Sequence, residues 1–295
     1  MKYGKPPLTV EQQVELLLSR GMIGDRTLIA SQLASVSYYR LSGYWLPFRS
    51  TDDSFKPGTT FENVWQRYVF DRQLRLLAID AIERIEVLVR TQLALHHSLN
   101  HGPFAYIANP ASLPNLDSNR YNEFINHIEN ETSRSHETFV KHFQTKYGDC
   151  HEHLPIWMAA EIMSFGCMLT FFRGSHPDIR KSIAVLFDVH DVVLESWLLT
   201  LNTIRNFCAH HSRLWNPVLG IKPKIPDKAE KWHKPVPITN DRIFSVFTIC
   251  KYCLDRIAPQ SRWSERVHTL LSKMPGIPLE SMGFPGNWEQ SPIWK

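Results

Sequence analysis

One stretch, FENVWQRYVFDRQLRLLAIDAIERIEVLVRTQL at residues 61–93, decides the fold class of this chain. Apolar side chains recur in it at every third or fourth position, which is the period of an α-helix. The preceding Thr59-Thr60-Phe61-Glu62 has the pattern of a capping box, and Glu86 stands four residues before Arg90, a favourable acid–base spacing on a helix. Asn100 to Pro103 ends the tract. An unbroken helix of about 40 residues approaches 60 Å, so we expect a kink or a hidden break.

Helical patterns continue on both sides of this tract, and none of the alternation typical of strands is present. We expect further helices at about 9–20, 25–36, 118–133, 136–147, 154–172, 177–187, 191–216, 241–257 and 262–273. Ser37–Phe48, SYYRLSGYWLPF, contains Gly43 and Pro47, which favour a turn or a short extended piece. The sequence therefore predicts an all-α protein. We expect an N-terminal helical extension at 1–56, a helical domain at 57–274 and an irregular C-terminal arm at 275–295 that covers apolar surface.

The composition places this chain of 295 residues among ordinary folded proteins, with 43% hydrophobic and 21% charged residues. Lys plus Arg number 33 against 29 Asp plus Glu, an excess that permits an anionic partner without requiring one. The N-terminus does not have the apolar core of a secretory signal, and the most apolar stretch carries Glu161 and is too short to span a membrane. Five scattered cysteines indicate a reducing compartment. We expect a cytoplasmic protein without a membrane partner.

Common catalytic and cofactor motifs are missing from the sequence: it contains no GxxxxGK[ST], GxGxxG, GxSxG or HExxH pattern. The lone pair Cys250-x-x-Cys253 lies in an apolar helical pattern, which favours buried small side chains over zinc ligands. Residues 149–153, DCHEH, contain three types of metal ligand, but a polar turn before Pro155 is the simpler interpretation. We therefore expect neither a metal nor a cofactor.

The candidate site is Arg205-Asn206-Phe207-Cys208-Ala209-His210, an RNxxxH motif that His211 and Arg213 follow. With 19 Arg, 13 Asn and 14 His in the chain, such a match arises by chance about 0.04 times. On a helix Asn206 and His210 share a face, whereas Arg205 lies about 140° from His210. Arg205 must therefore reach round the helix or meet the histidine of another subunit, which suggests a site shared across a homodimer.

An imidazole and a guanidinium, with no obvious metal ligands in the sequence around them, suit the transfer of a phosphoryl group at an RNA phosphodiester. His210 can deprotonate the 2′-hydroxyl or protonate the leaving oxygen, Arg205 can neutralise charge on the phosphoryl oxygens, and Asn206 can hold the imidazole or the phosphate. A structural interpretation stays open, because the last turns of helices favour Arg and His for electrostatic reasons.

Three blocks in the same order, Ser37–Phe48, Phe70–Arg90 and Arg205–Asn216, resemble the bacterial Abi family of the AbiD/AbiF type over about residues 8–216. The resemblance implies a bundle similar to HEPN proteins, whose Rx4-6H motif marks metal-independent endoribonucleases that are often homodimeric toxins. It implies that Arg205 and His210 form the catalytic pair and that Asn206 occupies the polar position after the arginine.

The same resemblance implies weaker supporting roles for Glu86 and Arg90 and a toxin that acts in abortive infection against phage, restrained by a cognate RNA or protein antitoxin. His211 and Arg213 are candidates for supporting the site or binding RNA. Two alternatives stay open: a non-catalytic RNA-binding or regulatory module that uses the same basic helix end, and a metal enzyme that uses His151 and His153.

Overall fold

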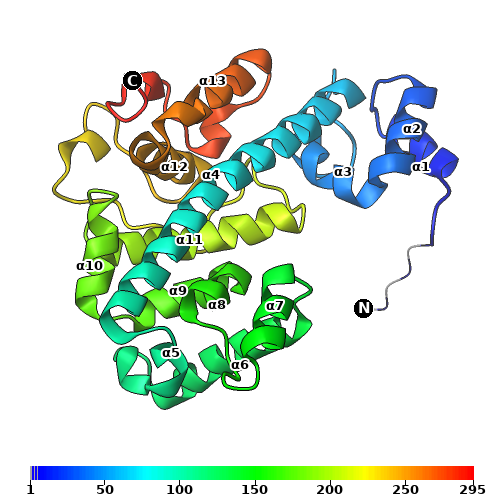
Figure 1. Cartoon of the computed structure of the whole chain (residues 1–295). Helices are drawn as coiled ribbons and strands as arrows, with labels where there is room; N and C mark the ends of the chain where they lie inside the picture. Colours follow the sequence, from blue (N-terminus) through cyan, green and yellow to red (C-terminus); the bar gives the residue numbers. More distant parts are fainter. Residues whose placement is uncertain (1, 3, 5) are drawn as a thin grey trace. The chain divides into compact units, whose positions relative to one another are not determined.

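The computed structural model describes residues 2, 4 and 6–295 (Figure 1). In this part of the chain the regular structure is entirely helical apart from two isolated bridges, Ile23 with Thr60 and Arg49 with Phe55. The all-α prediction is confirmed. The α-helices are α1 (Val10–Ser19), α2 (Arg26–Val36), α3 (Tyr38–Trp45), α4 (Phe61–His101), α5 (Ala105–Ala108), α6 (Ser118–Arg134), α7 (Thr138–Tyr147), α8 (Ile156–Ile162), α9 (Phe165–Gly174), α10 (Pro177–Val185), α11 (Asp191–Ala209), α12 (Ile243–Ile257) and α13 (Trp263–Lys273). Short 3-10 helices are η1 (Leu46–Phe48), η2 (Pro110–Ser112), η3 (Glu230–Trp232), η4 (Pro259–Ser261), η5 (Leu279–Met282) and η6 (Trp288–Gln290).

The described chain divides into two compact units. One comprises the described residues up to Leu76 together with Val267–Pro278, and the other comprises Leu77–Arg266 and Leu279–Lys295. The boundaries that we expect after residue 56 and after residue 274 stay predictions.

The first unit contains an aromatic helix where the sequence favours a turn or an extended piece. Ser37–Phe48 forms α3 and η1, so that expectation is wrong. The Ser37 hydroxyl accepts a hydrogen bond from the backbone N–H of Arg40, and α3 buries Leu41, Tyr44 and Trp45. Burial of these large side chains outweighs the low helix propensity of Gly43, because each contributes about 2 kcal/mol or more against about 1 kcal/mol for the glycine.

A buried polar network joins α3 to α4 in the same unit. The Tyr44 hydroxyl donates a hydrogen bond to Asp71 Oδ2 over 2.6 Å, and Arg75 Nη1 forms an ion pair with the same oxygen. All three side chains are buried. Burial and the neighbouring Asp71 carboxylate raise the pKa of Tyr44 far above its ordinary value. The block SYYRLSGYW is therefore held to the block FDRQLR by the Tyr44 hydroxyl, which binds a charge pair of α4 that is shielded from water.

Helix α4 runs without interruption over 41 residues, which by the rise of an α-helix is about 60 Å. The expectation of a hidden break is wrong. Its N-terminus is capped by Thr60, whose hydroxyl accepts from the N–H of Asn63. Buried apolar side chains recur along α4 as far as Leu93 and keep it packed against its neighbours. They are Phe61, Val64, Phe70, Leu74, Ala78, Ile82, Ile85, Val89 and Leu93.

In the second unit, the apolar stretch 154–172 forms two helices instead of the single helix that we expect. Helix α8 ends at Ile162, and α9 begins after Ser164, whose hydroxyl accepts from the N–H of Cys167. Ser164 is an N-cap, and it starts a new helix at the point where the chain changes direction.

The core of this unit is built on α12, in which twelve of the fifteen residues are buried, including Cys250 and Cys253. The last residues of the chain pack on it. Trp294 donates from Nε1 to the hydroxyl of Thr248 over 2.9 Å, and its ring stacks on that of Phe244. Apart from η5 and η6 the arm is irregular, and the residues from Leu279 onward cover apolar surface as expected.

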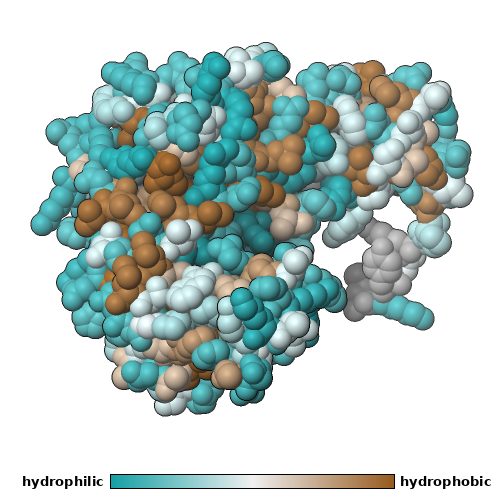
Figure 2. Space-filling model, in the orientation of Figure 1, coloured by the Kyte–Doolittle hydropathy of each residue, from teal (hydrophilic) through white to brown (hydrophobic). Residues whose placement is uncertain are grey.

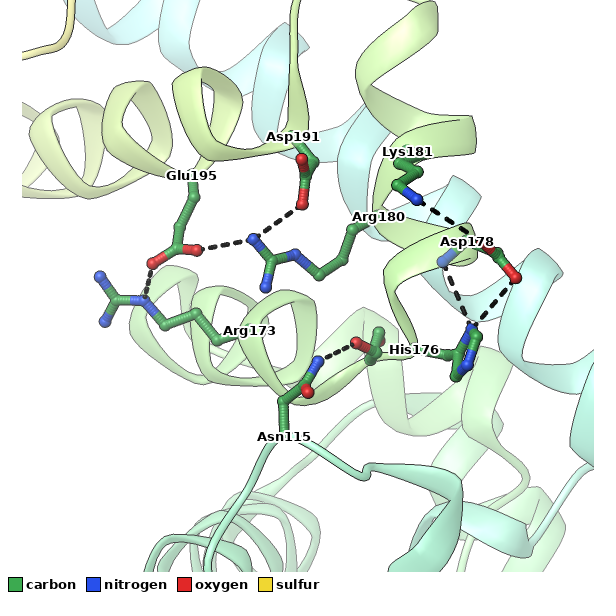
Figure 3. Close-up of polar contacts among 9 residues, drawn as sticks. Asn115, Arg173, His176, Asp178, Arg180, Lys181, Asp191 and Glu195 are labelled. Carbon is green, nitrogen blue, oxygen red and sulfur yellow. Dashed lines mark hydrogen bonds and ion pairs between the residues drawn. The ribbon is translucent and has the colours of Figure 1, made fainter.

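Charged side chains fix the start of α11 against the helices before it (Figure 3). Arg180 of α10 lies between Asp191 and Glu195 of α11, with both oxygens 3.0 Å from Nη2. Arg173 of α9 donates from Nε to Glu195 over 2.9 Å. This network and the buried face of α11 set the direction in which the opposite end of the helix points.

Candidate functional site

The RNxxxH motif occupies the last turn of α11, which ends earlier than expected. The helix stops at Ala209, and His210 is the C-cap residue. The N–H of His211 donates to the carbonyl of Cys208 over 3.0 Å, and the N–H of Ser212 donates to the carbonyl of Phe207 over 2.8 Å. These two bonds form a Schellman motif, which closes a helix with a residue in the left-handed conformation.

His211 is that left-handed residue, with φ of +56°. Glycine is the usual residue at this position because a Cβ is disfavoured there, although histidine adopts it more often than branched residues do. Backbone strain of this kind is concentrated at functional sites. The turn places His210 and His211 next to each other on the surface, and both are exposed.

The three motif side chains, Arg205, Asn206 and His210, are exposed at the end of α11. Ile204, directly before the motif, and Cys208, within it, are buried and hold the helix to the core. Arg205 Nη1 lies 3.4 Å from Asn206 Oδ1. Within the described residues Arg205 forms no ion pair with a carboxylate and no hydrogen bond with His210. The guanidinium and the imidazole are thus accessible to an anionic ligand.

The segment after the motif is anchored firmly. Leu214 and Trp215 are buried, and the carbonyl of Asn216 accepts from Arg242 Nη1 over 2.6 Å. Arg213, between the turn and these anchors, is partly exposed. The turn that carries His210 and His211 is therefore held on both sides, which restricts the motion of the imidazoles.

Glu86 and Arg90 lie on α4 in the same unit and are mostly buried. Arg90 pairs with Glu86 and donates to the carbonyls of Glu161 and Met163 over 3.1 and 2.9 Å. These carbonyls belong to the end of α8 and the connection to α9, where the helix no longer supplies donors. The pair stabilises the connection between α8 and α9, and no contact of either side chain with Arg205 or His210 is recorded among the described residues.

The start of α9 lies beside α11, and its residues were not predicted as part of a site. A Cβ on Gly166 would stand 3.9 Å from the Asn202 side chain, one turn before the motif arginine. Ser164 Oγ is 3.0 Å from His127 Nε2 of α6. Between α6 and α9 lies a cavity of about 460 Å³. The only local signal for this feature is the serine cap itself, because His127 is distant in sequence.

Four of the five cysteines are buried, and Cys150 is exposed. Burial raises the pKa of the Cys167 thiol to about 12, and Cys208 is buried. No group of three His, Cys, Asp or Glu side chains in residues 2, 4 and 6–295 is arranged to hold a metal ion. His151 of the DCHEH run stacks on Phe104 at a centroid distance of 4.7 Å. The described helices also include none that is long and apolar enough to cross a bilayer.

The chemistry available at the end of α11 is that of an arginine, an amide and two imidazoles on a rigid, exposed turn. Such a set can bind a phosphodiester and transfer a proton. The same cations also complement the negative end of the dipole of α11.

Comparison with known proteins adds the family. The family model described as "Abi-like protein" matches residues 31–216, which include α3, α4 and the whole of α11. No curated protein and no solved structure gives a match. Because the family match covers more than half of the chain and extends through the RNxxxH motif to Asn216, this chain belongs to the Abi-like protein family.

Proposed function

We propose that this chain is an abortive-infection toxin that defends its host against phage as a HEPN-type, metal-independent endoribonuclease. The observation that carries the proposal is the exposed end of α11, where Arg205, Asn206 and His210 lie at a turn that buried residues hold on both sides. Within the described residues Arg205 has no carboxylate partner. Family membership supports the role in abortive infection.

The reaction begins with proton transfer from an RNA 2′-hydroxyl to His210. The 2′-oxygen attacks the adjacent phosphorus, a new O–P bond forms, and the bond from phosphorus to the 5′-oxygen breaks. A proton returns to the leaving 5′-oxygen from an acid. Arg205 stabilises the charge on the non-bridging oxygens, and Asn206 holds the phosphate or the imidazole by hydrogen bonds.

A homodimer supplies the acid for the second proton transfer of this reaction. In such a dimer His210 of one copy acts as the base, and His210 of the other copy supplies the acid that protonates the leaving 5′-oxygen. Two copies related by a two-fold axis would place two such helix ends on one RNA strand. His211 and Arg213 would bind neighbouring phosphates, and Glu86 and Arg90 would support the site through the connection between α8 and α9.

The test is His210→Ala compared with His142→Ala, which removes an exposed histidine on α7 away from the motif. The unmodified protein and H142A should cleave single-stranded RNA in the presence of EDTA and leave 2′,3′-cyclic phosphate ends. H210A should lose about 10²–10⁴-fold in rate, the usual contribution of a positioned acid or base. RNA with 2′-O-methyl groups should resist cleavage. Equal cleavage by H210A and H142A would contradict the mechanism.

A second candidate function is a non-catalytic RNA-binding or regulatory module in phage defence. Exposure of the basic end of α11 favours it equally, because exposed basic side chains bind phosphate oxygens without any catalytic step. In that case Arg205→Ala would weaken RNA binding and reduce its salt dependence, and the unmodified protein would cleave nothing. A cognate RNA or protein antitoxin would restrain either form of the protein until infection.

A further inference from the structure

A second surface lies at the start of α11, at the opposite end from the RNxxxH motif. Between the turn that joins α10 to α11 and the loop of residues 224–229 is a cavity of about 880 Å³, which we name the α10–α11 groove. Most of its lining is aliphatic: Val185, Val189, Val193, Ile225, Pro226 and Ala229. Phe, Tyr and Trp are absent from the lining residues that the structure describes.

Apolar surface extends from the groove onto the neighbouring helices. Val185 is 71% exposed, Leu186 41% and Val192 48%. In Figure 2 hydrophobic surface gathers over α10 and the start of α11, with hydrophilic residues around it. A continuous exposed apolar patch with a polar rim is typical of an interaction site.

Hydrogen bonds hold both walls of the groove in place. The backbone N–H of Lys224 donates to Ser196 Oγ over 2.9 Å, and Trp197 Nε1 donates to the carbonyl of Lys224 over 2.8 Å. On the opposite wall, Asp188 Oδ2 accepts from the hydroxyl of Tyr252 over 3.0 Å. A ligand would therefore meet a groove that is already formed, which lowers the entropy cost of binding.

The rim carries positive charge that the protein itself does not neutralise. Lys224 and Lys228, the two lysines of the lining, form no ion pair within the described residues. The carboxylate of Asp188 is already engaged by Lys231 and Arg256. Asp227 is the remaining acidic residue of the lining, so the unpaired groups at the groove have a positive balance.

We propose that the α10–α11 groove binds an acidic segment of a protein partner. Aliphatic or aromatic side chains of that segment enter the groove between Val185, Val193 and Ile225. Its carboxylates pair with Lys224 and Lys228 at the rim. Grooves that accept apolar anchors from a peptide while charges at the edge select it are a common mode of recognition.

The lining favours a protein segment over the other anionic ligands. Single-stranded nucleic acid is generally held by several aromatic side chains on which successive bases stack, whereas the described lining contains no Phe, Tyr or Trp and a single imidazole, that of His190. A lipid surface is bound by apolar side chains that protrude from a face, whereas these side chains line a concave groove. An acidic peptide with apolar anchors satisfies both the aliphatic walls and the lysines.

The groove is separate from the proposed reaction. Val193 of its lining is near the start of α11, which begins at Asp191, and His210 follows Asp191 by 19 residues, about 28 Å by the rise of an α-helix. Binding at the groove does not require RNA cleavage, so it can be tested whether or not the proposed nuclease activity is found.

The experiment is a selection of peptides of about 12 residues from a random displayed library against the full-length protein, with the winners measured by fluorescence anisotropy. Enriched sequences should combine Asp or Glu with Leu, Ile, Val or Phe. Val185→Asp and the double variant Lys224→Glu/Lys228→Glu should each weaken binding at least tenfold. Leu99→Asp and Lys141→Glu change one exposed apolar residue and one exposed lysine elsewhere, and they should leave the Kd unchanged.

Several outcomes would overturn the proposal. These are a selection without enrichment, enrichment of basic or neutral peptides, and equal binding to the groove variants and the controls. Two further probes separate other occupants: vesicles of phosphatidylglycerol and a labelled single-stranded RNA. Binding of either probe that V185D abolishes while L99D does not would assign the groove to a membrane or to nucleic acid. Dissociation of a dimer by V185D, measured by light scattering, would assign it to a second copy of this chain.

Discussion

Two arginines on helices, Arg75 in α4 and Arg205 in α11, have opposite surroundings. Arg75 is buried and shares the oxygen of Asp71 with the Tyr44 hydroxyl. Arg205 is exposed, and Asn206 is its one recorded neighbour within the described residues. A buried guanidinium neutralises the buried carboxylate beside it, so its removal would leave that charge uncompensated, whereas a guanidinium that faces solvent near an imidazole is available to a ligand.

The largest effect on stability is expected from Arg75→Ala. This change leaves the Asp71 carboxylate buried without its cation, which costs about 3–5 kcal/mol of unfolding free energy. Arg205→Ala should change that free energy by less than about 0.5 kcal/mol, because an exposed side chain is removed. Urea unfolding followed by circular dichroism measures both. A loss of more than 2 kcal/mol in R205A would remove the contrast between the two arginines.

A second prediction concerns the buried imidazole of His97. Burial, with a smaller contribution from His101, lowers the pKa of His97 from 6.5 to about 4, while its Nε2 lies 3.3 Å from Ser112 Oγ. The unfolded chain therefore binds a proton at higher pH than the folded protein does. The contribution of His97 to stability is fully present above about pH 6.5 and is lost as the pH falls towards 4.

Unfolding in urea at pH 7 and at about pH 4.5 should show the expected loss, about 2–3 kcal/mol from this group. His97→Gln should lessen the pH dependence, because the variant has no imidazole to protonate at this buried position. An identical pH dependence in H97Q and in the unmodified protein would show that His97 is protonated equally in both states.

The smallest effect concerns the turn that carries the imidazoles. His211→Val places a branched side chain at φ of +56° and should cost about 1–2 kcal/mol, whereas His211→Gly meets no steric penalty there. Thermal unfolding of the two variants distinguishes them. If H211V is as stable as H211G, the left-handed turn is not the ending of α11 in solution.

Local signals in the sequence were sufficient where the residues that form a feature are close neighbours. The helix expected at about 9–20 is present as α1, and Thr9 and Gln12 form a capping box at its start, with both hydrogen bonds in place. The period of the 61–93 tract likewise predicted α4. In the motif, four-residue spacing predicted that Asn206 and His210 belong to one helix end, and the N–H of His210 does donate to the carbonyl of Asn206.

Predictions failed where distant residues decide the conformation. Helix α3 exists because Tyr44 and Trp45 find buried partners, and no pattern within Ser37–Phe48 shows those partners. The stretch 154–172 is divided because Arg90 supplies donors to the carbonyls that the break leaves without partners. The end of α11 at Ala209 depends on Leu214 and Trp215, which bury themselves and draw the chain away.

The sequence by itself determined the all-α class, the main helical faces and the presence of a basic, histidine-containing helix end, because helical periodicity and capping act over a few residues. Only the tertiary structure decided which arginine is buried and which is exposed, and only it formed the α10–α11 groove. Burial and charge pairing depend on side chains that are far apart in the chain, and the free energy of packing them together exceeds the local preferences that a sequence displays.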